Sequence, residues 1–244
     1  MTERSEAFRR YSADGFLVLG GLTALLLQLG DPAVARGVAA HSSFAQDPLR
    51  RLHGTLRYVY TVALGSERQR DRVARAVDGS HARVPGARDP DRQLWVAATL
   101  VRTGTDIHAL LRRPLDPRLA DEVHAAGADL ATLLQLPPSA WPRDRAAFDA
   151  YWDATIATLD VGHDARAVAT DLFAARHIPW WGRLAMPSVK ILTAGMLPPA
   201  VREAYGLVHS PRRFRAVVRM LRVLARVTPR SLRELPSRRL LAKD

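Results

Sequence analysis

Apolar residues recur every three or four positions along nearly the whole 244-residue chain. Alanine, leucine and arginine fill most segments, whereas the alternating β-branched runs that would indicate strands are missing. The pattern predicts an all-α protein, with helices at about 14–29, 32–45, 48–64, 66–78, 91–112, 116–135, 143–159, 163–174, 184–195, 198–206 and 210–227. We expect a single multi-helix domain, residues 1–210, followed by a basic amphipathic C-terminal extension, residues 211–244, packed on that domain.

Two aspartate–proline pairs mark predicted helix starts. Asp31 precedes Pro32 and Asp116 precedes Pro117. The aspartate side chain accepts hydrogen bonds from the first free backbone N–H groups of a helix, and proline tolerates the first helical position. We therefore expect a capped helix to begin at each pair.

Two strongly apolar segments, residues 16–29 and 94–111, are predicted to be central buried helices. The first has about 14 residues, whereas a helix that spans a bilayer needs roughly 20. Residues 1–13 are charged rather than hydrophobic, which is unlike a secretory signal. These features predict a cytoplasmic protein.

The net charge of +12 is concentrated at the C-terminus. Residues 211–244 hold 11 basic and 2 acidic residues, whereas the remaining 210 residues hold 25 basic and 22 acidic ones. The body is therefore nearly balanced. Because the basic extension lacks interleaved aromatic residues for base stacking, we do not expect a nucleic-acid partner.

The extension carries one amphipathic segment. One side bears a stripe of arginines at three- and four-residue steps: Arg212, Arg215, Arg219, Arg222 and Arg226. The other side is apolar, and we expect Phe214, Val217, Leu221 and Leu224 to pack inward on the domain. Binding to an anionic membrane surface is the alternative, less favoured because it requires an apolar side that is free to insert.

Familiar catalytic signatures are missing from the sequence. It contains no Gly-x-Ser-x-Gly elbow, no phosphate-binding glycine loop and no His-Glu-x-x-His. Without any cysteine, a thiolate haem ligand or a disulfide framework is impossible. Eight histidines on a helical scaffold remain, and histidine is the usual proximal ligand of haem iron.

An ordered series of sequence blocks resembles the MpaB-type and latex-clearing-protein oxygenases. The blocks cover most of the chain: residues 19–65 (LGGLTALLLQLGDPAVARGVAAHSSFAQDPLRRLHGTLRYVYTVALG), 73–86 (VARAVDGSHARVPG), 94–101 (LWVAATLV), 113–115 (RPL), 190–207 (KILTAGMLPPAVREAYGL) and 210–213 (SPRR). The resemblance implies an all-helical fold that holds haem b between helices. It also implies activation of O₂ at the iron and oxidation of an apolar substrate.

The same resemblance assigns candidate site residues, several of which are altered in this chain. In the LWVAATLV block the family usually carries a histidine, the expected proximal ligand, where this chain has Ala97. His81 matches a position near the expected distal side and is our candidate catalytic residue. His41 also matches a family position. We therefore predict a cofactor pocket bordered by Ala97, Val101 and His81.

A replacement ligand is possible in principle. His108 lies on the same helix side as Ala97, but 11 residues correspond to roughly 16 Å along the axis, so the haem would have to shift. For each histidine, a hydrogen-bonded structural role is the simpler interpretation. The alternative function is therefore a family member that has lost haem ligation and acts as a non-catalytic binding or interaction protein.

Overall fold

The computed structural model of the chain describes residues 4–40, 48–82, 86–133, 136–176 and 178–242. Within these ranges all regular secondary structure is helical and no strand occurs, which confirms the predicted all-α class. The α-helices are α1 (Glu6–Ala13), α2 (Gly21–Leu29), α3 (Pro32–Ala40), α5 (Pro48–Leu64), α6 (Glu67–His81), α7 (Pro90–Leu111), α8 (Pro117–Thr132), α9 (Arg145–Thr158), α10 (His163–Ala174), α11 (Trp180–Met196), α12 (Pro199–Ala204), α13 (Pro211–Val227), α14 (Arg230–Arg233) and α15 (Leu235–Leu241). Two 3₁₀ helices, η1 (Gly15–Gly20) and η2 (Pro138–Ala140), complete the set.

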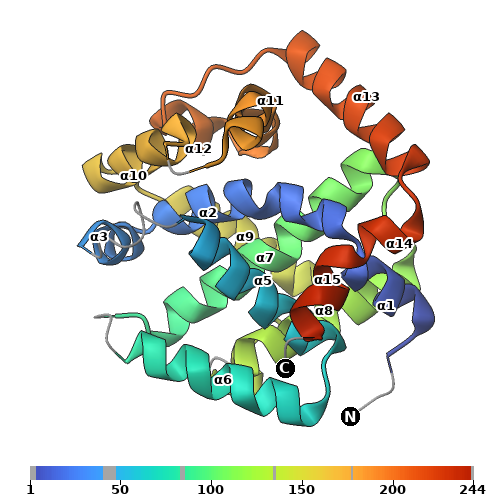
Figure 1. Cartoon of the computed structure of the whole chain (residues 1–244). Helices are drawn as coiled ribbons and strands as arrows, with labels where there is room; N and C mark the ends of the chain where they lie inside the picture. The colour runs from blue at the N-terminus through green and yellow to red at the C-terminus, as the bar shows by residue number, and fades with distance from the viewer. Residues whose placement is uncertain (1–3, 41–47, 83–85, 134–135, 177, 243–244) are drawn as a thin grey trace.

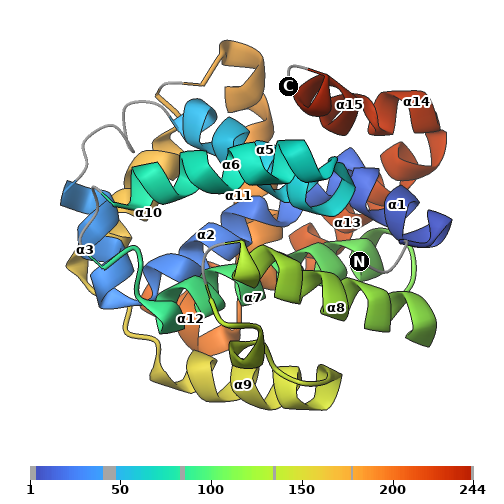
Figure 2. The same ribbon diagram turned by 90° about the horizontal axis from the view of Figure 1, so that it is seen from below.

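Helices α2 and α7 lie at the centre of the molecule, with the other helices arranged around them (Figures 1 and 2). The side that carries α6 and α8 faces away from the side that carries α11 and α13 (Figures 1 and 2). Helix α7 packs along η1 and α2 and also contacts α8 and α13. The two apolar segments predicted to be buried are therefore the centre of the fold.

The aspartate–proline pairs start helices as predicted. The Asp31 carboxylate accepts a hydrogen bond from the backbone N–H of Ala33 at 2.7 Å, where α3 begins. The Asp116 carboxylate accepts one from the N–H of Leu119 at 3.0 Å, where α8 begins. Both caps pair N–H groups that have no partner within the helix.

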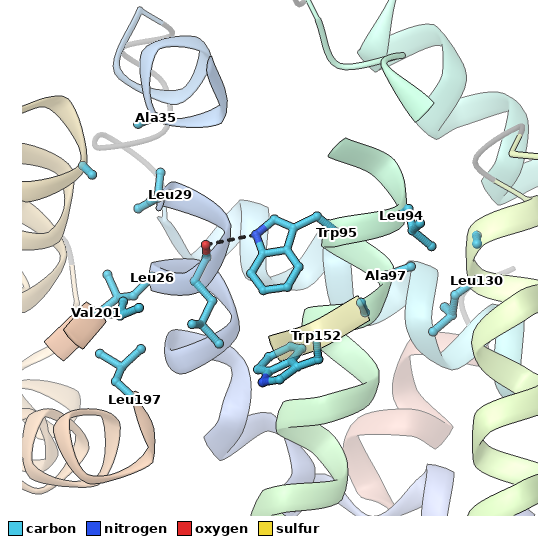
Figure 3. Packing of buried hydrophobic residues seen from close by; sticks show 14 of the residues in the cluster. Leu26, Leu29, Ala35, Leu94, Trp95, Ala97, Leu130, Trp152, Leu197 and Val201 are labelled. Carbon is cyan, nitrogen blue, oxygen red and sulfur yellow. Dashed lines mark hydrogen bonds between the residues drawn. The ribbon is translucent and has the colours of Figure 1, made fainter. Parts of the chain in front are cut away.

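Hydrogen bonds from aromatic side chains fix the C-terminal end of α2. The indole Nε1 of Trp95 on α7 donates to the carbonyl oxygen of Leu27 at 3.1 Å, as Figure 3 shows. The hydroxyl of Tyr205 donates to the carbonyl oxygen of Leu26 at 2.7 Å. Both carbonyls lie in the last turn of a buried helix and also accept the backbone N–H of Gly30, so each aromatic donor uses the second lone pair of its acceptor oxygen. The aromatic donors therefore join α2 to α7 and to the end of α12.

The C-terminal region packs on the domain through α13 and through an ion-pair cluster. Val217 and Val218 are buried against α7 and α11. The ring of Phe214 lies so close to Gly195 of α11 that a Cβ there would come within 2.1 Å of it. Arg233 of α14 donates a hydrogen bond to the buried carboxylate of Asp14 at 2.9 Å, which joins the C-terminal helices to the N-terminal region. Arg112, at the end of α7, donates to the same carboxylate at 3.0 Å.

The structure departs from the predicted elements in three places. Residues 14–29 form η1 and α2 rather than one helix, with the break at Gly20, where a Cβ would lie 2.8 Å from the carbonyl oxygen of Thr103. Helix α11 begins at Trp180, four residues earlier than expected. The short helices α1, α14 and α15 were not predicted.

No single helix in the described ranges is long and apolar enough to cross a membrane, although α1 together with η1–α2, bent by 53°, passes the same test as a pair.

Trp95→Phe tests the bond that joins α2 to α7. The substitution removes the indole donor and part of a buried ring, so we expect it to lower the free energy of unfolding by about 2 kcal/mol. Trp180→Phe is the matched control, because Trp180 is 68% exposed and its replacement should change stability by less than about 0.5 kcal/mol. Urea unfolding of both variants checks the prediction, and equal effects would contradict it.

Ending the chain after His209 tests whether α13–α15 belong to the domain core. The truncation uncovers the apolar surface beneath Val217 and Val218 and removes Arg233 from Asp14. We expect a loss of about 3 kcal/mol or more, since each buried valine contributes about 1.5–3 kcal/mol. A chain ending at Ala242 is the control. A thermal unfolding midpoint equal to that of the full chain would show that the segment is dispensable.

Candidate functional site

The helices enclose a cavity of about 480 Å³ next to the central pair. Its walls come from η1, α2, α5, α7, α8 and α11, together with Phe8 and Tyr11 of α1. Most of the lining side chains are aliphatic. The volume lies within the range of about 300–1,000 Å³ that is typical of small-molecule sites. The cavity is therefore the candidate functional site.

One face of α5 forms a continuous wall of this cavity. Leu52, Leu56, Val59 and Ala63 line it at steps of three and four residues, which places them on one side of the helix. Leu52 is also exposed to solvent, as are its neighbours Arg51 and Thr55 along the wall. The N-terminal part of α5 therefore forms the mouth of the cavity, and its C-terminal part forms the interior.

A buried hydroxyl without a partner distinguishes the interior of the cavity. Tyr60 of α5 lines it and is 3% exposed, and its hydroxyl finds no hydrogen-bond partner among the described residues. Burial, with a smaller contribution from the carboxylate of Asp14, raises the pKa of Tyr60 to about 12. The group is therefore a protonated phenol at neutral pH, and a buried polar group of this kind calls for a partner.

The amide of Gln28 is the other notable polar group on the cavity wall. Its Nε2 donates to the hydroxyl of Thr99 at 2.8 Å, and that hydroxyl donates to the carbonyl oxygen of Val96 at 2.7 Å. Gln28 therefore both lines the cavity and joins α2 to α7. Its polar side chain within an apolar helix is explained by this bridge.

Sequence reasoning missed Tyr60 and the cavity wall on α5. A signal was present, because two tyrosines, Tyr58 and Tyr60, lie two positions apart in the apolar half of the helix. Their hydroxyls differ in their partners: the Tyr58 hydroxyl donates to the carbonyl oxygen of Leu130, and the Tyr60 hydroxyl has no partner in the described ranges. The pattern alone could not distinguish them.

Of the three residues expected to border a cofactor pocket, only Val101 lines the cavity. Ala97 is fully buried in the main apolar core, where Figure 3 shows it between Trp95 and Leu130. It does not line the cavity. The expected axial position is therefore occupied by a methyl group inside packed core rather than by a side chain that faces an open space.

His81 ends α6 and lies outside the cavity lining. It is half-buried, and burial, together with the positive charge of nearby Arg51, lowers its pKa. His81 is therefore not among the side chains that face the cavity. Its imidazole is neutral at pH 7.

The other two histidine candidates are not brought to the cavity lining by the described structure. His108 is half-buried and packs edge-on against Tyr11, with ring centroids 5.3 Å apart. Burial, with Arg112 nearby, lowers its pKa. His41 lies outside the described residues. No histidine of the described ranges lines the cavity, so these residues do not fit a histidine-ligated haem.

Within the same ranges, no group of three or more histidine or acidic side chains is arranged to hold a metal ion. The side chains of other known haem ligand types on the cavity wall are Tyr11, Tyr60 and Met186. None replaces the expected axial residue on α7. The arrangement that the described residues do provide is an apolar chamber with a phenol donor.

Two similar proteins are both uncharacterized. One is from Mycobacterium bovis and the other from Mycobacterium tuberculosis. Each is 32% identical over 222 residues, which cover 84% of this chain and 87% of the relative. No solved structure matches the chain significantly.

Residues 9–228 match the catalytic domain of a family described as ER-bound oxygenase mpaB/B′/rubber oxygenase. The match spans η1 and α2, the cavity helices α5, α7, α8 and α11, and all of α13. It includes every block on which the resemblance was based. The chain therefore belongs to the family of MpaB-type and rubber oxygenases.

Proposed function

We propose that the protein is a non-catalytic member of this family that binds an apolar small molecule carrying one polar group. The observation that carries the proposal is the 480 Å³ aliphatic cavity, in whose wall the Tyr60 hydroxyl has no hydrogen-bond partner among the described residues. An apolar body would replace water along the α5 and α2 walls. A carbonyl or hydroxyl oxygen on the ligand would accept the phenol hydrogen bond.

A second candidate function is haem b-dependent oxidation of an apolar substrate, with activation of O₂. Family membership favours it. It requires an axial ligand at a position other than 97, because alanine cannot bind iron. His41, which lies outside the described residues, is the candidate. Haem that stays bound to the wild type through gel filtration and is lost from His41→Ala would support this function against the first.

Tyr60→Phe and Tyr58→Phe form a matched pair that tests the unpaired phenol. Both tyrosines are buried on α5, and both changes remove one hydroxyl. Tyr58→Phe breaks the bond to Leu130, so we expect it to lower the free energy of unfolding by about 1 kcal/mol. Tyr60→Phe removes a buried hydroxyl that has no partner in the described part of the chain, and it should leave that free energy unchanged or raise it. Equal losses in urea unfolding would contradict this assignment.

A titration with 1-aminoanthracene, a fluorescent apolar molecule with one polar group, tests ligand binding. We expect saturable binding by the wild type. Ala63→Phe should weaken it about tenfold or more, because the added ring occupies the cavity. Tyr60→Phe should weaken it about fivefold through the lost hydrogen bond.

Ala154→Phe makes the same change at an exposed position of α9 and is the control for the titration. It should bind as the wild type does. If the wild type does not bind the probe, or if folded Ala63→Phe binds it unchanged, the cavity is not the ligand site.

A further inference from the structure

Helix α13 has three distinct faces rather than the two that an amphipathic helix usually has. Its inner face, which includes Phe214, Val217 and Leu221, packs on α7 and α11. The guanidinium of Arg222 also donates to the carbonyl oxygen of Leu110 on α7 at 2.7 Å. The helix is therefore fixed along the outer edge of the molecule, where Figure 1 shows it at the upper right.

A second apolar face of α13 points to solvent. Met220, Val223, Leu224 and Val227 are 46%, 55%, 44% and 66% exposed. Their spacing of three, four and seven residues places them in one row along the helix. Leu224 was expected to pack inward with Phe214, Val217 and Leu221, but it belongs to this exposed row instead. We call these four residues the outer apolar row.

Arginines fill the remaining face. Arg212, Arg215, Arg219, Arg222 and Arg226 are all exposed, and α13 contains no acidic residue. At 100° per residue, this stripe lies between the inner face and the outer apolar row. The solvent side of α13 therefore presents aliphatic side chains directly beside a row of positive charge.

From this arrangement we propose that the outer side of α13 docks on an anionic lipid bilayer surface. The outer apolar row would enter the boundary between headgroups and acyl chains, and the arginines would pair with anionic headgroups. The inner face keeps its contacts with the domain, so docking needs no unfolding. The inference rests on α13 alone and is independent of the cavity and its ligand.

Charge and composition favour this occupant over the two other classes of partner. A second copy docked through the same face would bring two arginine stripes together, and like charges oppose such contact. Nucleic acid would pair with the arginines but would leave the outer apolar row exposed, and that row has no aromatic side chain for base stacking. An anionic bilayer matches both features at once.

The test is sedimentation of the full chain with lipid vesicles. We expect it to sediment with vesicles of phosphatidylcholine mixed with phosphatidylglycerol and to remain in the supernatant with phosphatidylcholine alone. Raising the salt concentration should weaken binding, because exposed charges are screened. Arg219→Gln with Arg226→Gln should weaken it about fivefold for each charge removed.

Substitution of the outer apolar row separates insertion from charge attraction. Val223→Gln, Leu224→Gln and Val227→Gln together should weaken vesicle binding about tenfold or more while the thermal midpoint stays unchanged, since all three residues are exposed. Two controls should bind as the wild type does. Leu184→Gln with Val208→Gln changes exposed apolar residues elsewhere, and Arg68→Gln with Arg118→Gln removes two exposed charges elsewhere.

Three outcomes would overturn the proposal. The first is no binding of the wild type to anionic vesicles. The second is equal loss of binding in the row variant and in a control variant, which would make the effect unspecific. The third is a different partner: binding of an RNA oligonucleotide, or a dimer in solution that the row variant abolishes, without vesicle binding in either case.

Discussion

The fold depends on the burial of α2 and, with it, of the backbone carbonyls at its C-terminal end. Helix α2 has nine residues, and five of them are buried. The carbonyl oxygens of Leu26 and Leu27 in its last turn each accept the backbone N–H of Gly30 and keep a second acceptor site, which burial removes from water. Trp95 and Tyr205 donate to these second sites. The two bonds join α7 and the end of α12 to α2.

The residues that pair with α2 belong to the sequence blocks that resemble the family. Trp95 and Thr99 belong to the LWVAATLV block, and Tyr205 belongs to the block at 190–207. Each pairs with α2, whose residues belong to the first block. Residues of these blocks therefore form the hydrogen bonds that join α2 to its neighbouring helices. Ala97 takes part in none of these side-chain bonds, so the residue at position 97 can differ without loss of the central packing.

The helical class, the central helices and the capped starts at Pro32 and Pro117 were predictable because each rests on local pattern. The break at Gly20 was not, since the close approach of Gly20 to Thr103 joins residues that lie far apart in the sequence. The same limit applies to the site. Whether Tyr60 or Tyr58 finds a partner, and whether Leu224 faces inward, depends on how helices pack in three dimensions and not on spacing along one helix.

We propose that this chain keeps the family's helical fold and an apolar cavity but does not bind haem. The most direct test is the absorption spectrum and iron content of the full-length protein purified from cells supplied with haem. We expect a folded, iron-free protein without a Soret band. A Soret band with one iron per chain would contradict it and would assign haem chemistry to this member as well.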